Sequence, residues 1–306
     1  MPFSSVVSRA FAAANRSIPG ILFCIVLFGI PQAMGIILGP YMTTQVQPKP
    51  GQPPGPEMLL MMGFGCFSCV WLLVIIFGAP WVYGGILGQH RDHIHHPGQP
   101  PGSFSEYAGR CYARMLGMTA IVLGVCFAIM IPIGCIGWVL AMSQLQGPGG
   151  QIDPQKMQEL AQHPINIAAG VLMIVWMTAI GTLFNPAYVI LWGEDESITS
   201  SMKKSYRLLR DNRSDAVKLF FVYLLLGMVM WVLRPVIGVL QIKAMPVIVP
   251  IGIALGFYVS YLPVLNFGIA TSLYLARKPA VEPETADIPE DAAADEDRQD
   301  GEGEMI

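Results

Sequence analysis

Five long stretches of this chain contain no Asp, Glu, Lys or Arg, and they constrain the fold more than any other feature. They lie between residues 16 and 49, 57 and 91, 114 and 153, 159 and 194, and 243 and 277. Each is longer than the roughly 20 apolar residues that a helix needs to cross a bilayer. Charged residues make up only 13% of the chain, about half of the ~25% usual in soluble domains. The sequence therefore predicts a polytopic membrane protein.

We expect an all-α fold with six transmembrane helices. The apolar runs place them near residues 18–42, 58–88, 116–143, 165–192, 216–240 and 245–275. The fifth is the weakest, because Arg234 and Pro235 follow a clean apolar run of only 219–233, which leaves open whether this helix extends past Arg234. The tail from 279 to 306 is rich in acids and lacks aromatic residues, so we expect it to be disordered.

Basic residues separate sharply once these spans are drawn. Thirteen Lys and Arg residues fall on one side of the predicted membrane and four on the other. The positive-inside rule places the richer side in the cytoplasm. Because six spans return the chain to its starting side, both termini and the acidic tail are predicted to be cytoplasmic.

Short basic segments precede the first, third and fifth spans, with apolar residues at helical spacing on one face. We expect three amphipathic helices that lie on the inner leaflet. The basic residues expected to face anionic lipid are Arg9, Arg16, Arg110, Arg114, Lys203, Lys204, Arg207 and Arg210. The alternative is that these segments only anchor the topology.

The same segments suggest an internal repeat within a membrane domain of residues 1–278. Asn15-Arg16-Ser17 recurs as Asn212-Arg213-Ser214. Units of about 1–97, 98–193 and 194–278 would each hold one interfacial helix and one hairpin of two spans. Repeats in the same orientation would place a candidate site where the units meet; chance similarity between basic anchors is the alternative.

Residues 193–212 resemble a recurring cytoplasmic stretch of the YciC-like bacterial membrane proteins. The likeness is carried by Lys204-Ser205-Tyr206-Arg207 and Asp211-Asn212, which follow a short acidic turn. Relatives of that family include the membrane domain that precedes some glycerophosphodiester phosphodiesterases. The resemblance implies a multi-pass protein of the bacterial inner membrane. It implies no reaction, because the chain shows no phosphodiesterase domain and the family has no settled biochemistry.

The densest set of potential metal ligands is a run of four histidines, His90, His93, His95 and His96. Imidazole suits zinc, nickel, copper or iron, and Glu106 or Cys111 of the next segment would be able to complete a site. However, Pro97 ends any helix directly after the run, and no second cluster has ligand spacing. A connector that binds metal only adventitiously is the favoured interpretation, and we expect no resident cofactor.

Cys66 and Cys69 have the spacing of a dithiol redox pair. A quinone-coupled oxidoreductase would relay electrons to cysteines in an outer loop, and the predicted outer loops contain none, so we expect buried, inert thiols. Three further patterns, Gly35-x-x-x-Gly39, Gly84-x-x-x-Gly88 and Gly252-x-x-x-Gly256, allow close helix packing within the chain or between copies of it.

Three amide side chains, those of Gln32, Asn185 and Asn266, lie deep inside predicted spans. Each is near a proline, which frees a backbone carbonyl to accept a hydrogen bond. Local satisfaction of a kinked helix is the plainer interpretation, and a polar lining for a substrate path is the functional one. No charged residue accompanies the amides, which argues against proton-driven pumping and selective ion conduction.

Three classes of function follow. We expect first a non-enzymatic scaffold, regulatory or lipid-interacting component of a membrane assembly. The alternative is a transporter or lipid-handling protein with a cavity between three hairpin repeats, which a polar cavity reaching the three amides would favour. A metal or thiol enzyme is the third, and no catalytic residue is identified. Expected partners are membrane lipids, anionic ones included, and other membrane proteins or copies of this chain, with no nucleic acid.

Overall fold

The computed structural model describes residues 2–45, 56–96, 99–145, 164–243 and 245–278. Residues 1–276 belong to one compact unit, and the remainder of the chain to a second. The predicted disordered tail, 279–306, lies outside the described residues.

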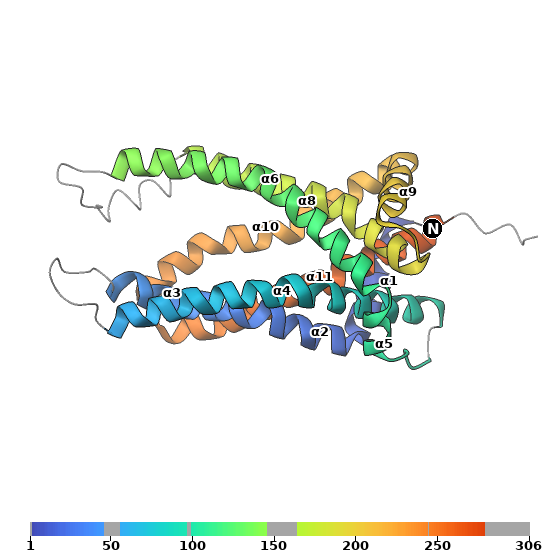
Figure 1. The fold of residues 1–306 in the computed structure, drawn as a ribbon, viewed down its shortest axis with the longest axis horizontal. Coiled ribbons are helices and arrows are strands. Elements are labelled where there is room, and N and C mark those ends of the chain that lie inside the picture. Colours follow the sequence, from blue (N-terminus) through green and yellow to red (C-terminus); the bar gives the residue numbers. More distant parts are fainter. Residues whose placement is uncertain (1, 46–55, 97–98, 146–163, 244, 279–306) are drawn as a thin grey trace, which may run out of the picture. The chain divides into compact units, whose positions relative to one another are not determined.

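Every regular element in the described part of the chain is helical (Figure 1). The elements are α1 (Phe3–Arg16), α2 (Ile18–Cys24), the π-helical turn η1 (Ile25–Gly29), α3 (Ile30–Gln45), α4 (Pro56–His95), α5 (Phe104–Gly109), α6 (Tyr112–Leu145), α8 (Pro164–Gly193), α9 (Ile198–Asp211), α10 (Arg213–Lys243) and α11 (Met245–Arg277). The all-α prediction is confirmed for these residues.

Five of the described helical segments are long and apolar enough to cross a bilayer. They are Ile18–Ile37, Gly65–His95, Tyr112–Ile133, Ala168–Gly193 and Ile248–Arg277. These segments support a polytopic membrane protein. The expected fifth span, 216–240, falls on α10, which is not among the five. The α10 helix continues past Arg234 to Lys243, so the Arg-Pro pair does not end it.

The first span shows how a proline is accommodated between helices. Pro31 has no N–H to donate to the carbonyl of Leu27, four residues earlier. The π-helical turn η1 precedes this proline. The indole Nε1 of Trp71, on α4, donates to the Leu27 carbonyl oxygen at 3.1 Å. A side chain of a neighbouring helix therefore satisfies the carbonyl that the proline leaves free.

Glycines allow α11 to cross the first span closely. A Cβ added to Gly256 would lie 2.7 Å from the carbonyl oxygen of Gly29, and one added to Gly252 would lie 3.0 Å from the side chain of Ile37. Ordinary side chains at these positions would force the helices apart. The Gly252-x-x-x-Gly256 pattern is thus used within the chain.

The short helices α1, α5 and α9 lie at the same end of the long helices (Figure 1). In α5, Ala108 packs on Gly84 of α4, where an added Cβ would lie 3.3 Å from the Ala108 Cα. In α9, the Ser205 hydroxyl donates to the Leu183 carbonyl of α8 at 2.6 Å. In α1, Ala10 packs on α11. Each short helix is therefore held against a long one by small or hydroxyl-bearing residues.

Candidate functional site

Two cavities lie between the long helices. The first, the lateral cavity, has a volume of about 490 Å³ and lies between α8, α10 and α11. The second, the central cavity, has a volume of about 280 Å³ and is lined by α4, α6, α8 and α11. Both are lined mainly by apolar side chains, as expected for ligand sites that bury most of a small molecule.

The two cavities share three lining residues: Gly181 and Asn185 of α8, and Asn266 of α11. Gly181 and Asn185 are one helical turn apart and so lie on the same face of α8. Two of the three amides singled out in the sequence are therefore brought to one place. The third, Gln32, is half-buried and lines neither cavity.

Hydrogen bonds connect the polar groups where the two cavities meet. We call this place, at Asn185 and Asn266, the junction. The hydroxyl of Tyr223, on α10, donates to the backbone carbonyl of Asn266 at 2.9 Å, and it also interacts with the side chain of Asn185. The side-chain oxygen Oδ1 of Asn266 is buried without a hydrogen-bond partner in the part of the chain that the structure describes. An unsatisfied buried acceptor costs about 1–3 kcal/mol. Local satisfaction of a kinked helix does not account for this oxygen.

Polarity changes along the lateral cavity. The α8 residues that line it extend from Gly170 to Asn185, a separation of about 22 Å along the helix axis. Apolar residues occupy the first part, among them Met173 and Met177, and polar side chains follow only from Thr178 onward. Apart from Thr178, the polar lining consists of the junction groups Asn185, Tyr223 and Asn266. The cavity therefore has a long apolar part and one polar end.

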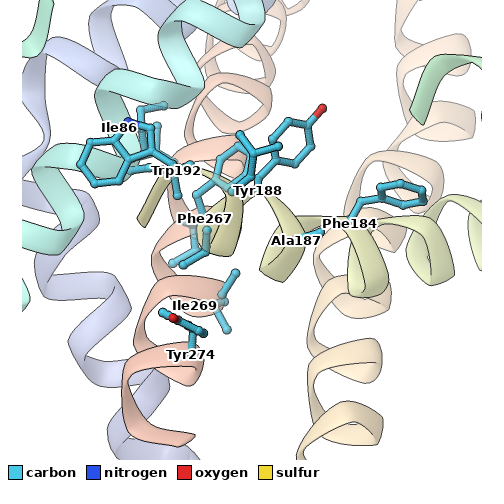
Figure 2. Close-up of a cluster of buried hydrophobic side chains, with 14 of the residues drawn as sticks. Ile86, Phe184, Ala187, Tyr188, Trp192, Phe267, Ile269 and Tyr274 are labelled. Carbon is cyan, nitrogen blue, oxygen red and sulfur yellow. The ribbon is translucent and has the colours of Figure 1, made fainter. Parts of the chain in front are cut away.

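Three aromatic rings close the central cavity at one end. They are Tyr83 of α4, Tyr188 of α8 and Phe267 of α11, and each is the last residue that its helix contributes to the lining. The ring centroids of Tyr83 and Phe267 are 4.8 Å apart, and those of Tyr188 and Phe267 are 5.7 Å apart. Figure 2 shows Tyr188 beside Phe267. The Tyr188 hydroxyl is hydrogen-bonded to Thr119 Oγ1 of α6 at 2.7 Å.

Sequence reasoning did not single out these rings or Tyr223, because aromatic residues within apolar runs look like ordinary core. One available signal was position: Tyr83, Tyr188 and Phe267 follow Pro80, Pro186 and Pro263, respectively, by two to four residues. Those three prolines lie inside α4, α8 and α11.

The histidines do not form a ligand set. His90 is 0% exposed and packs against α11, where a Cβ added to Gly268 would lie 3.2 Å from its Cε1 atom. Farther along the chain, the rings of His95 and His96 are 6.3 Å apart, and His96 is exposed. Among the described residues, no group of three or more His, Cys, Asp or Glu side chains is arranged to hold a metal ion. Helix α4 continues to His95. Its helical twist places His90 on the inward face, away from the exposed end of the histidine run.

Two of the predicted lipid-facing cations bind the acidic turn between α8 and α9. Lys204 Nζ lies 2.6 Å from carboxylate oxygens of both Glu194 and Glu196, and Arg114 pairs with Asp195. The hydrogen bond from Lys204 holds the pKa of the Glu196 carboxyl below its usual range. Hydrogen bonds to Glu194 and Glu196 raise the pKa of Lys204.

The other predicted cations are arranged differently. Arg9, Arg16, Lys203 and Arg207 are exposed. Arg210 is also exposed and lies 3.2 Å from the adjacent Asp211 carboxylate. The guanidinium of Arg110 lies 5.2 Å from the ring centroid of Trp192. Lys204 is exposed as well, so the four predicted cations of α9 are all exposed, and Lys204 is the one that pairs with the acidic turn.

Trp192 connects three elements at this end of the helices. Its Nε1 donates to the Tyr107 carbonyl of α5 at 3.1 Å, and the Tyr107 ring meets it edge-on at 5.7 Å. The Tyr107 hydroxyl donates to the carboxylate of Asp92, on α4. Figure 2 shows Trp192 and Ile86 of α4, which belong to the same hydrophobic cluster. A tryptophan at the end of an apolar run is typical of a membrane interface, and this signal was present in the sequence.

The cysteines lie partly where the sequence did not place them. Cys24 and Cys126 are buried, but Cys66 and Cys69 are exposed on α4. The prediction of burial is wrong for this pair, because the face of α4 on which they lie is not covered by another described helix.

Comparison of the chain with protein-family models, curated proteins and solved structures finds no match. The likeness to the YciC-like proteins therefore stays a prediction from residues 193–212.

Proposed function

We propose that this chain is a lipid-handling membrane protein that binds an amphiphile between its spans. The observation that carries the proposal is that two apolar cavities share the polar lining residues Asn185 and Asn266. A polar junction inside an otherwise apolar site matches a molecule with an apolar body and a small polar group. Transport of such a molecule across or along the membrane is the corresponding activity.

The dimensions of the lateral cavity support the same class of ligand. Its lining along α8 spans about 22 Å, whereas one leaflet of a bilayer contributes about 15 Å of hydrocarbon, half of the ~30 Å core. The lining from Gly170 to Asn185 is therefore long enough for a lipid chain of one leaflet's length whose polar group lies at Asn185.

We also propose a membrane topology for this chain. Six spans would form three hairpin units, each preceded by an interfacial helix, with both termini in the cytoplasm of a bacterial cell and the spans in its inner membrane. In support, α5 packs on α4 and α9 on α8, in each case the long helix that precedes it in the chain. α1 contacts α11, the last long helix, and it also packs on α4. The central cavity is lined from all three expected units.

Binding of a radiolabelled monooleoylglycerol to the purified full-length protein in lipid nanodiscs tests the proposal. The diagnostic variant is Gly227→Leu, because Gly227 lines the lateral cavity and nothing lies within 4 Å of an added Cβ. The matched control is Gly124→Leu on α6, which also has nothing within 4 Å of its added Cβ and lines neither cavity.

We expect saturable binding that Gly227→Leu weakens at least tenfold and Gly124→Leu leaves unchanged. Oleate and oleylamine are tested in the same way, so that the result does not depend on one headgroup. If no member of this panel binds, or if both glycine variants behave alike with every member, the proposal is wrong.

A second candidate function is an interaction of α9 with anionic lipid headgroups. Lys203 and Arg207 are exposed, and the Tyr206 side chain between them is 60% exposed. Each basic residue near an anionic surface contributes about 1 kcal/mol. The double variant Lys203→Gln/Arg207→Gln should therefore weaken enrichment of phosphatidylglycerol around the protein by roughly 30-fold. An unchanged lipid composition after native extraction would remove this candidate.

A further inference from the structure

We infer that the two cavities, at their shared residues Asn185 and Asn266, select an amphiphile without an ionised headgroup, whose polar end is a hydroxyl or an amide. This inference rests on the proposed lipid-handling function and specifies its substrate class. Carboxylate, phosphate and ammonium headgroups are excluded by the same chemistry that admits the neutral ones.

The two cavities offer no counter-charge to an ionised headgroup. None of the described residues that line the two cavities is an Asp, Glu, Lys, Arg or His. The sequence explains why: residues 160–193, 219–233 and 244–276 contain no Asp, Glu, Lys or Arg. A charge removed from water is stabilised only by an opposite charge or a full set of hydrogen bonds. An ionised headgroup at the junction would find no such charge.

The polar residues of the junction lie deep within the spans. Asn185 lies eight residues before the end of α8 at Gly193, which places it about 12 Å from that end along the helix axis. A headgroup that contacts Asn185 is therefore within the hydrocarbon layer rather than among the lipid headgroups. A charged lipid with its headgroup at the surface would leave the junction amides unused.

The junction itself offers only neutral hydrogen-bonding groups. Amide groups and the Tyr223 hydroxyl are neutral donors and acceptors, and the Tyr223 hydroxyl oxygen keeps acceptor capacity while its proton is donated to the Asn266 carbonyl. A hydroxyl or amide headgroup both donates and accepts, as these partners do. Such a headgroup is able to exchange hydrogen bonds with the junction without leaving a charge unpaired.

The test is competition among ligands that share one oleoyl or oleyl chain and differ in the headgroup. Radiolabelled monooleoylglycerol is displaced from the full-length protein in nanodiscs by oleoyl ethanolamide, oleyl alcohol, oleate, oleylamine or oleoyl lysophosphatidic acid. We expect the neutral competitors to bind at least tenfold more tightly than the three charged ones. Charged competitors that bind equally well, and that Gly227→Leu also weakens, would overturn the inference and leave the proposed function intact.

A designed change of preference provides the second measurement. Replacing Asn185 by Lys places a cation at the junction, and the affinity for oleate relative to monooleoylglycerol should then rise at least tenfold. The matched control is Gln32→Lys, an amide in a span that lines neither cavity, and it should leave the ratio unchanged. Gly181→Lys, one helical turn from Asn185 at a position that lines both cavities, gives the same readout if the Asn185 variant does not accumulate. An unchanged ratio in the folded lysine variant also overturns the inference.

Discussion

Replacing Gly256 by Ala should separate α11 from the first span. The new Cβ would lie 2.7 Å from the carbonyl oxygen of Gly29, about 0.7 Å inside the 3.4 Å at which ordinary contacts begin. Both groups belong to helix backbones, so no flexible side chain is able to move aside. Overpacking of this kind costs about 1–3 kcal/mol, which corresponds to a shift of roughly 5- to 150-fold in the unfolding equilibrium.

The measurement is unfolding by sodium dodecyl sulfate in mixed micelles, followed by tryptophan fluorescence. Gly124→Ala is the control, because nothing lies within 4 Å of its added Cβ. We expect the control to change the free energy of unfolding by no more than about 0.5 kcal/mol. Equal stability of the two variants would refute the close crossing of α11 and η1.

Three further results are expected. The lowered pKa of Glu196 and the raised pKa of Lys204 mean that their ion pair is present at neutral pH and is lost in acid, as Glu196 protonates. The protection of α9 amides relative to their intrinsic exchange rates should therefore fall in acid, and Lys204→Met should lower it already at pH 7; protection that does not change with pH contradicts this. Burial and a hydrogen bond to Asp195 raise the pKa of the Cys111 thiol. Asp195→Asn should therefore speed alkylation of Cys111 about tenfold for each pKa unit by which its pKa falls, as measured by peptide mass spectrometry. An unchanged alkylation rate would refute the contact between Cys111 and Asp195. Trp192→Ala should lower the free energy of unfolding by about 3–5 kcal/mol and increase amide exchange in α5. Unchanged exchange in α5 would show that the indole does not hold that helix.

Helix positions were predictable because a bilayer leaves few alternatives. An uncharged apolar run longer than 20 residues must satisfy its backbone internally, so it forms a helix. The expected 58–88 and 165–192 became Pro56–His95 and Pro164–Gly193. The ends differ because polar residues such as Gln89 continue a helix beyond the apolar run: the Ser17 hydroxyl donates to the side-chain oxygen of Gln89 at 2.7 Å.

The candidate site was predictable only in part. Deep amides stand out in an apolar run, and two of the three do lie at the cavity junction. Gln32 belongs to the same residue class but lies on a different face of the bundle, and no sequence pattern records which faces meet. The pairing of Lys204 with Glu194 and Glu196 was hidden for a related reason. A basic helix face resembles a lipid-binding surface until a nearby acidic turn is seen to fold onto it.

The wall shared by the two cavities limits how many molecules the site is able to serve. Asn185 has one amide, with two donor hydrogens and one acceptor oxygen, and it borders both spaces. An occupant on one side that engages this amide takes those groups away from any occupant on the other side. Simultaneous guests would therefore compete, and a stoichiometry of one molecule per chain is the natural outcome.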